Sequence, residues 1–451
     1  MKRALLRAPA AAAAAALALT ACGTSTPAAS KLSTTSTSAS AKTAKAVPVT
    51  VWTLSSDAVE QGLYEKVVKA FNKSYPGGDV SVDFIQNTPY KTKIAVAMSA
   101  KHPPTIFYTW GGTLFDAWVK AGEVMPMGKT LASDPSWKSD FLPNVWPLAS
   151  YKGAVYAVPE DGPGIELMFE NKAVLKKAKA VLSPGTWSSL LNDVRLVKKT
   201  GVSPVVVAGA TEWPEMIWLQ YLTLRYGGPA VFNSIASGAP NAWNKAAVLK
   251  AATDVQELAK MGAFEPGYSA VHYGSGETDE LMAAGKAAFQ AQGDWDYSDM
   301  VEYAASFARS ANYANFEFPT VPGEKSNPSD LVGEPASYYG ISSYATASAK
   351  KEAVAFEKYL TTSSVYNVSE LEKYGSTPVD RKFATEMKSV AGGAVLYHFY
   401  ELAAKAPYLQ DYWDQDLPDA VVTPMLTAIG ELFDLTITPA QFIKTMDRVR
   451  A

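Results

Sequence analysis

The stretch 49–121 decides the fold, and its short apolar runs are VTVW (49–52), VSVDFI (80–85) and TIFY (105–108). Each run is rich in β-branched and aromatic residues, which is typical of a strand. Residues 57–75 and 88–101 carry apolar side chains at helical spacing, and a further helix is expected between Gly111-Gly112 and residue 121. Strands and helices therefore alternate, which indicates an α/β fold with a largely parallel sheet.

The alternation restarts in the second half of the chain. SPVVVA (203–208) and AAFQ (287–290) predict two more strands, and 246–261 predicts an amphipathic helix between them. From residue 350 the pattern is mostly helical, and Thr438-Pro439 is expected to open the last helix. We find no internal repeat of about 20–50 residues. The sequence thus predicts two α/β lobes followed by a helical C-terminal part.

The composition excludes several classes of protein. The 41 basic side chains do not exceed the 44 acidic ones, so there is no positive excess to neutralise a nucleic acid. A single cysteine rules out an intramolecular disulfide and a multi-cysteine zinc site. The three histidines, His102, His272 and His398, are far apart and lack ligand spacing. We expect no metal, no cofactor and no nucleic-acid partner.

The N-terminal segment predicts an address outside the cytoplasm. A basic start and an alanine-rich apolar run over 1–21 are typical of a signal peptide. LTACG (19–23) resembles the lipobox of bacterial lipoproteins, in which cleavage precedes the cysteine and its thiol is lipidated. Residues 22–46 therefore read as a lipidated Cys22 followed by a disordered tether of Ser, Thr, Ala and Lys. We expect an extracytoplasmic lipoprotein anchored to the cell membrane; the alternative is a secreted protein with an incidental cysteine.

The charge of the remaining chain is clearly negative. Six of the 41 basic residues and none of the acidic ones precede residue 47, which leaves 35 basic against 44 acidic side chains and a net charge of −9. An acidic body is not attracted to an anionic lipid surface by its own charge.

Aromatic residues recur beside polar ones where strands are expected to end. Ligands of open α/β sheets bind beyond the carboxyl ends of the strands. A Trp or Tyr ring can cover the apolar face of a sugar, while Asp, Glu, Asn and Ser bind its hydroxyls. Core packing is the alternative for each single aromatic residue. The candidate ligand-binding residues are Trp52, Ser55, Asp57, Asn87, Trp110, Gly111, Asp161, Trp213, Asp294, Trp295, Glu334, Tyr338, Trp413 and Asp414.

Other motifs give weaker interpretations. Asp294-Trp295-Asp296 could be a metal-binding DxD, but acids in this setting are more common as hydroxyl acceptors or helix caps. Fragments of a serine β-lactamase pattern, such as Ser348-Ala349-Lys350, occur in the reverse order along the chain. No G-x-S-x-G elbow or phosphate-binding loop is present, and no pair of acids stands out as a glycosidase pair.

Several longer segments resemble one family. They are YKTKIAVAMSAKHPPTIFYTWGG (90–112), YAVPEDGPGIELMFENKAVL (156–175), LMAAGKAAFQAQGDWDYS (281–298) and EPASYYGIS (334–342). In this order they resemble the extracellular sugar-binding lipoproteins of ABC importers, the group that includes maltose-binding protein. The nearest resemblance is to the subgroup that binds xylobiose and other neutral oligosaccharides.

The resemblance implies a two-lobed periplasmic-binding-protein-like (type II) fold with a hinge. Lobe one would comprise 47–159 with 312–362, and lobe two 160–311 with 363–451. Trp52 to Asp57, Asn87, Trp110 and Gly111 would line the wall of lobe one, and Asp161 would lie at the crossover. Trp213, Trp295 and Trp413 would be the stacking rings of lobe two, with Glu334 and Tyr338 near the hinge.

The function implied is capture of a neutral sugar or oligosaccharide by hinge closure and delivery to the permease subunits of an ABC importer. Such a receptor is a monomer and not an enzyme. Two alternatives stay open: a secreted carbohydrate hydrolase, and the same receptor fold for a peptide or a polyamine, which the net charge of −9 would suit.

Overall fold

The computed structural model describes residues 47–55 and 58–449. The predicted signal peptide over 1–21, the tether over 22–46 and Cys22 lie outside the described residues, and so does Asp57. Within the described part of the chain, no helix has the length and apolar character needed to cross a membrane.

The first sheet contains the strands predicted over 49–108. It has five strands in the order β2-β1-β3-β12-β6. β1 is parallel to β2 and β3, whereas β12 is antiparallel to β3 and β6. The strand bounds are Val49–Leu54 (β1), Val80–Ile85 (β2), Ile106–Thr109 (β3), Ala157–Asp161 (β6) and Ser337–Ile341 (β12).

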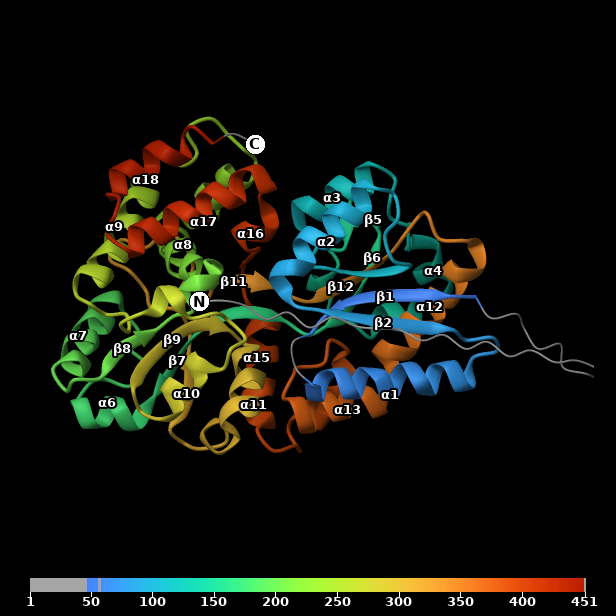
Figure 1. The fold of residues 1–451 in the computed structure, drawn as a ribbon, viewed down its shortest axis with the longest axis horizontal. Coiled ribbons are helices and arrows are strands. Elements are labelled where there is room, and N and C mark those ends of the chain that lie inside the picture. Colours follow the sequence, from blue (N-terminus) through green and yellow to red (C-terminus); the bar gives the residue numbers. More distant parts are fainter. Residues whose placement is uncertain (1–46, 56–57, 450–451) are drawn as a thin grey trace, which may run out of the picture. The chain divides into compact units, whose positions relative to one another are not determined.

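Helices flank this sheet and bury one apolar stripe each. In α1 (Ala58–Ser74), Leu63, Tyr64, Val67 and Phe71 recur every three or four residues and are buried in the core of the first lobe. The other helices of this lobe are α2 (Asn87–Ser99), α3 (Gly112–Lys120), α4 (Gly128–Ser133), α5 (Pro135–Ser139) and α12 (Ala347–Thr362), with a β4 (Ser150–Tyr151) and β5 (Ala154–Val155) hairpin (Figure 1).

The second sheet has six strands in the order β13-β11-β7-β9-β8, with β10 also paired to β7. The bounds are Gly164–Asn171 (β7), Ser203–Val206 (β8), Ala287–Gly293 (β9), Tyr313–Phe316 (β10), Leu331–Glu334 (β11) and Leu409–Gln410 (β13). The strands predicted near 203–208 and 287–290 are present. The expectation of largely parallel sheets fails here, because β7 runs antiparallel to β9, β10 and β11.

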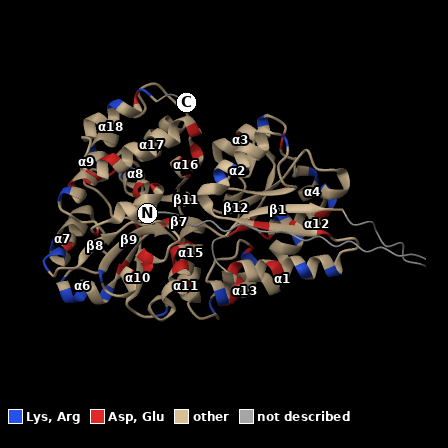
Figure 2. Ribbon diagram, in the orientation of Figure 1, with Lys and Arg blue, Asp and Glu red and all other residues tan. Residues whose placement is uncertain are grey.

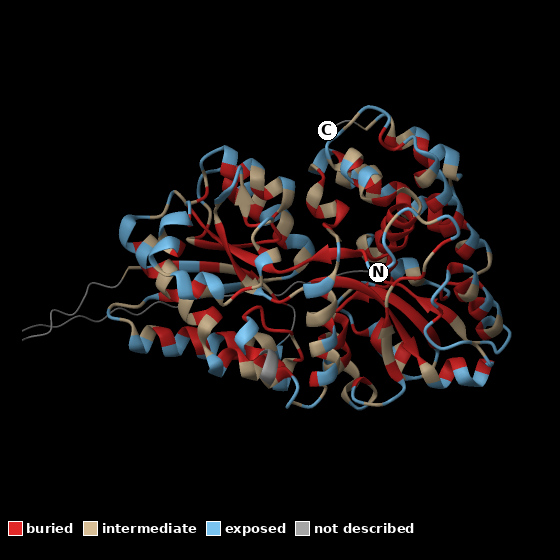
Figure 3. Cartoon of the chain, turned by 180° about the vertical axis from the view of Figure 1, so that it is seen from behind, coloured by how far each residue is buried: buried red, intermediate tan, exposed pale blue. Residues whose placement is uncertain are grey.

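The helices of the second lobe cover this sheet and form the C-terminal part. They are α6 (Lys172–Ala178), α7 (Trp187–Lys198), α8 (Trp213–Ala236), α9 (Ala246–Lys260), α10 (Glu277–Ala283), α11 (Asp296–Ala308), α14 (Ala384–Met387), α15 (Gly393–Lys405), α16 (Trp413–Asp416), α17 (Asp419–Phe433) and α18 (Pro439–Met446). Between α12 and α14 lies the short helix α13 (Ser364–Ser369). Thr438 opens α18 with a capping box to Gln441, as the sequence predicts. Most strands of the two sheets are buried (Figure 3), whereas β1 and β2 also carry exposed residues.

The chain passes between the two sheets at short links. Gly162 and Pro163 join β6 to β7, and Pro335 and Ala336 join β11 to β12. The stretch from 312 to 336, which the sequence-based division gives to lobe one, therefore pairs with the second sheet. The reason is packing, since Phe316 lies against Phe289 of β9.

The segment that contains α13 differs from the sequence-based division in the opposite direction, since it packs with the first lobe. α13 falls in the part of the chain given to lobe two, yet Tyr366 from this helix lies in the core of the first lobe, edge-on to Tyr64. We propose that the chain returns to the first lobe between Glu334 and Ser337 and stays with it through α13.

Candidate functional site

A cavity of about 660 Å³ lies between residues of the two sheets. Asn87 and Trp110 line it from the first lobe, and Trp213, Trp295 and Glu334 line it from the second. Its volume falls in the usual range of small-molecule sites, about 300–1,000 Å³. Gly162 and Pro163, which link β6 to β7, line the cavity, and so do Glu334 and Ser337 on either side of the link between β11 and β12. Both lobes therefore reach the same space.

Most of the predicted site residues line this one cavity. They come from strand ends and loops far apart in the sequence, which is the arrangement that the carboxyl-end rule predicts. Their contact with a ligand stays a prediction. The predicted residues that line the cavity are Ser55, Asn87, Trp110, Asp161, Trp213, Asp294, Trp295, Glu334 and Asp414.

Two predicted residues lie in a core instead of on the cavity. Trp413 has no exposed surface and packs against Phe232 and Trp243 in the core of the second lobe. Tyr338 is equally buried, and its hydroxyl donates to the carbonyl of Val145 at 2.6 Å. Trp413 begins α16 and is buried there, whereas its neighbours Tyr412 and Asp414 line the cavity.

Two more predicted residues are near the cavity but do not line it. The Trp52 ring is half-buried, and the Lys93 ammonium lies 4.1 Å from its centroid. Gly111 has a φ of +83°, and a Cβ there would lie 2.5 Å from the carbonyl oxygen of Leu148. Gly111 thus permits the backbone at Leu148 to approach closely. The close approach is to another segment of the chain, whereas the sequence predicts a ligand there.

The rings of the second lobe form one aromatic wall. Trp295 packs edge-on against Trp213 at 6.0 Å and against Tyr412 at 6.1 Å. Gly293 makes room for this arrangement, because a Cβ at that position would lie 2.2 Å from the Trp295 ring. The indole nitrogens of Trp213 and Trp295 are buried and have no hydrogen-bond partner within the described residues.

The wall of the first lobe is built around Trp110. Its ring lies edge-on to Tyr108 and Tyr90 at 5.0 and 6.0 Å, and the Lys91 ammonium lies 5.2 Å from the ring centroid. Tyr90 fixes the position of α2, since its hydroxyl donates to the carbonyl of Tyr108 at 2.6 Å.

Acidic side chains between the two walls are unusually buried. Desolvation raises the pKa of Glu166, Asp294 and Glu334 well above the ordinary values. The negative charge of Asp411 raises the pKa of Glu334 further, and Asp161 does the same for Asp294. These groups therefore hold protons to higher pH than exposed carboxyls do.

The DxD interpretation does not fit the geometry of its two acids. An oxygen of Asp294 accepts from the backbone N–H of Ile165 at 3.0 Å, whereas Asp296 accepts from Gln290 and Tyr313 at 2.8 and 2.7 Å. Both acids thus stabilise the fold. Within the part of the chain that the structure describes, no group of three or more His, Cys, Asp or Glu side chains could hold a metal ion.

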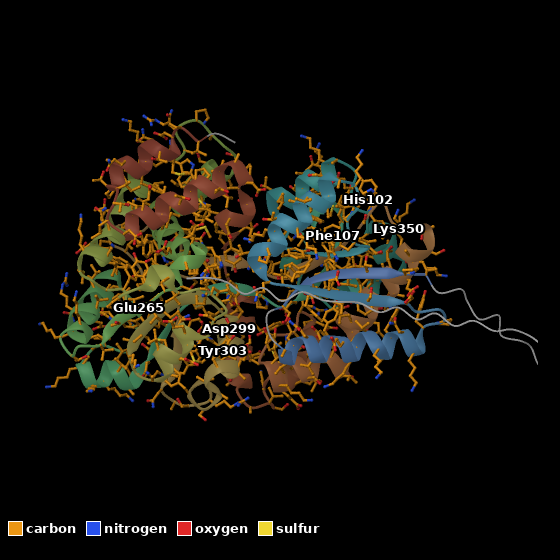
Figure 4. The ribbon with its side chains drawn as sticks, in the orientation of Figure 1. His102, Phe107, Glu265, Asp299, Tyr303 and Lys350 are labelled. Carbon is orange, nitrogen blue, oxygen red and sulfur yellow. The ribbon has the colours of Figure 1, made fainter. Side chains whose placement is uncertain are left out.

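Several lining residues escape sequence reasoning. In the segment Tyr412-Trp413-Asp414 the sequence predicts Trp413 as the ring that lines the cavity, whereas Tyr412 is the ring that does so. Glu166 is an acid inside an apolar strand, which is a readable signal. Tyr273 and Asp299 give no local signal; their contact of 2.9 Å joins a loop to α11, where Figure 4 labels Asp299.

Residues 56–367 match the family described as bacterial extracellular solute-binding protein. The chain belongs to this family. The match includes every strand of the two sheets of the solute-binding protein except β1 and β13, and most of the residues that line its cavity. A search of curated protein sequences gives no match.

Solved structures share the fold of this solute-binding protein. One, from a study of xylan utilization by Caldanaerobius polysaccharolyticus, is 23% identical with a TM-score of 0.80, over 89% of this chain and 99% of that chain. A chitin oligosaccharide binding protein is 22% identical with a TM-score of 0.79, over 90% and 98%. RafE in complex with raffinose is 19% identical with a TM-score of 0.70, over 89% and 98%. The two-lobed fold of solute-binding proteins is therefore present here.

Proposed function

We propose that this solute-binding protein captures a sugar or short oligosaccharide and delivers it to an ABC importer in the membrane. The observation that carries the proposal is the cavity lining, in which aromatic rings stand beside buried polar atoms without partners. The indole N–H groups of Trp213 and Trp295 and one oxygen each of Glu166 and Glu334 are such atoms. Ring faces that cover C–H groups and polar atoms that bind hydroxyls are what a sugar requires.

The structural neighbours support a sugar as the ligand. Their titles refer to xylan utilization, a chitin oligosaccharide and raffinose. Capture would follow from a higher affinity of the closed than of the open arrangement of the lobes. The protein would act as a monomer, bind without chemical conversion, and leave transport to the permease subunits.

Calorimetry with a panel of xylo-, cello-, malto- and chito-oligosaccharides tests the proposal, after a thermal-shift screen has ranked them. We expect at least one dissociation constant on the order of micromolar. Absence of binding to every sugar at millimolar concentration would contradict it. New reducing ends during incubation would instead favour the hydrolase alternative, and binding only to a peptide or a polyamine would favour a non-sugar receptor.

We also propose that the protein is anchored outside the cytoplasm by a lipid on Cys22, after removal of residues 1–21. The support is the lipobox-like sequence around the single cysteine. The variant Cys22→Ser should appear in the medium or in the soluble extracytoplasmic fraction, whereas Ser25→Ala, a control in the tether, should stay with the membrane. Equal membrane association of both variants would exclude this anchor.

A further inference from the structure

The charge of the cavity lining has one sign. Among the described residues, no Lys or Arg lines the cavity. The acidic and basic side chains that do line it are all Asp or Glu, apart from His272. Lys and Arg lie instead on outer helices such as α6 and α1 (Figure 2). Lys91 lies next to the lining residue Asp414 and forms an ion pair with it.

Three of these acids come from adjacent strands of the second sheet. Glu166 lies on β7, Glu334 ends β11 beside Gly164 of β7, and Asp294 directly follows β9. Glu166 and Glu334 are only 1% and 2% exposed. One carboxylate oxygen of each has no hydrogen-bond partner, and no described Lys or Arg forms an ion pair with any of the three.

Carboxylates in this position are costly without a compensating cation. Burial disfavours their charged form, and the neighbouring acids add repulsion, as the raised pKa values of all three groups indicate. Asn or Gln side chains would bind the hydroxyls of a neutral sugar without this cost. A ligand that brings its own positive charge would offset it.

We propose that the ligand is a sugar or short oligosaccharide that carries a protonated amine, which lies between Glu166 and Glu334. The inference rests on the proposed function and names the class of its sugar, in place of the neutral sugar that the sequence suggests. The Tyr412 hydroxyl and the edge of the Trp295 ring lie beside Gly164, which pairs with Glu334 and precedes Glu166 by two residues on β7. Aromatic rings so close to the two acids add to the attraction of an ammonium group.

The free indole groups distinguish an amino sugar from a polyamine. The unpartnered N–H groups of Trp213 and Trp295, on residues that line the cavity, are donors available to an acceptor in the ligand. A protonated polyamine offers donors only, whereas sugar hydroxyl and ring oxygens accept hydrogen bonds. The acidic and the indole groups are thus both matched by one ligand that has hydroxyls and an amine.

The test compares sugars that differ at a single substituent. Calorimetry at pH 6 uses β-1,4-linked oligomers of glucosamine, glucose and N-acetylglucosamine, which carry an amine, a hydroxyl or an acetamide at the same carbon. The pairs galactosamine and galactose, and mannosamine and mannose, extend the comparison to other stereochemistries. We expect an amine-bearing sugar to bind at least tenfold more tightly than its hydroxyl and acetamide counterparts.

Two variants then locate the charge. Glu166→Gln and Glu334→Gln keep the size of the side chain, and each should weaken binding of the amine-bearing sugar at least tenfold more than it weakens binding of the neutral counterpart. Glu357→Gln is the matched control, because Glu357 is 1% exposed, also lacks hydrogen-bond partners, and does not line the cavity. Melting temperatures check that each variant is folded.

The outcomes separate the two proposals. Neutral sugars that bind as tightly as the amine-bearing ones, or Gln variants that retain the preference for the amine, would overturn this inference and leave the sugar receptor in place. Failure of every sugar, with or without binding of spermidine, would overturn the proposed function together with it.

Discussion

Lys91 on α2 and Asp414 on α16 form an ion pair of 2.6 Å that connects the first lobe to the second across the rim of the cavity. Asp414 is the more buried partner, with 7% of its side chain exposed against 28% for Lys91. A second contact runs beside it, from the Thr113 hydroxyl to Asp416 at 3.0 Å. These contacts join residues that separate when the lobes move apart, so they favour the closed arrangement.

Replacing Lys91 by Met should therefore weaken ligand binding without preventing folding. The ion pair is partly exposed, so we expect a loss of about 1 kcal/mol, or about fivefold in affinity. Calorimetry measures the affinity, and small-angle scattering without ligand should show a more extended average particle. Lys405→Met, which breaks the exposed pair of Lys405 with Glu401 on α15, is the control. Equal effects of the two substitutions would show that the Lys91 pair has no role in closure.

Trp295→Ala should reduce sugar affinity because it removes a ring from the aromatic wall. Loss of the buried area and of the stacking face is expected to cost about 1–3 kcal/mol of binding free energy, or roughly 5- to 150-fold in affinity. Trp413→Ala should instead lower stability, because it leaves a cavity in the core. We expect the free energy of unfolding to fall by about 3–5 kcal/mol. Calorimetry and chemical unfolding of both variants give the comparison, and an unchanged affinity in Trp295→Ala would remove this ring from the site.

Gly293→Ala should displace the Trp295 ring with little change of the backbone. The added Cβ would lie 2.2 Å from the far edge of the ring, and the side chain can rotate away more easily than β9 can move. We expect affinity to fall toward that of Trp295→Ala, and the Trp fluorescence to change in the absence of ligand. When Gly293→Ala is combined with Trp295→Ala, we expect the affinity of the double variant to equal that of Trp295→Ala alone. Additive losses of affinity would show that Gly293→Ala does not act through the Trp295 ring.

Local patterns predict the strands and most of the site because their signals lie within a few residues. Strand composition places β1, β2, β3, β8 and β9. Aromatic residues beside polar residues or glycines mark Trp110, Trp213 and Trp295 at the cavity. The choice between neighbouring side chains depends on which face of an element is buried. For this reason the sequence predicts Trp413 at the cavity, although Tyr412 lines it and Trp413 is buried in the core.

Long-range pairing could not be read from the sequence. β10 and β11 look like any other short strands, and only their hydrogen bonds to β7 assign them to the second sheet. The contact between Tyr273 and Asp299 similarly depends on how α11 packs. The cluster of acids around Glu166, which no described Lys or Arg of the cavity lining accompanies, also forms only when the fold brings separate acids together.

Glu215, at the start of α8, should make the stability of the protein depend on pH. Burial raises its pKa to about 8, and the charges of Asp434 and Glu212 contribute further. The folded state therefore binds this proton more tightly than the unfolded state, whose Glu has a pKa of about 4.3. The stability that comes from this group is fully present below the unfolded pKa and is lost as the pH rises through about 8.

Glu215→Gln replaces the carboxyl by a group that stays neutral. The variant should be about as stable as the natural protein at pH 5 and more stable at pH 9, by about 2–5 kcal/mol. Urea unfolding at pH 5, 7 and 9 measures this trend, with Glu65→Gln on the exposed face of α1 as the control. A difference between variant and natural protein that does not change with pH would mean that Glu215 keeps its charge in the folded state.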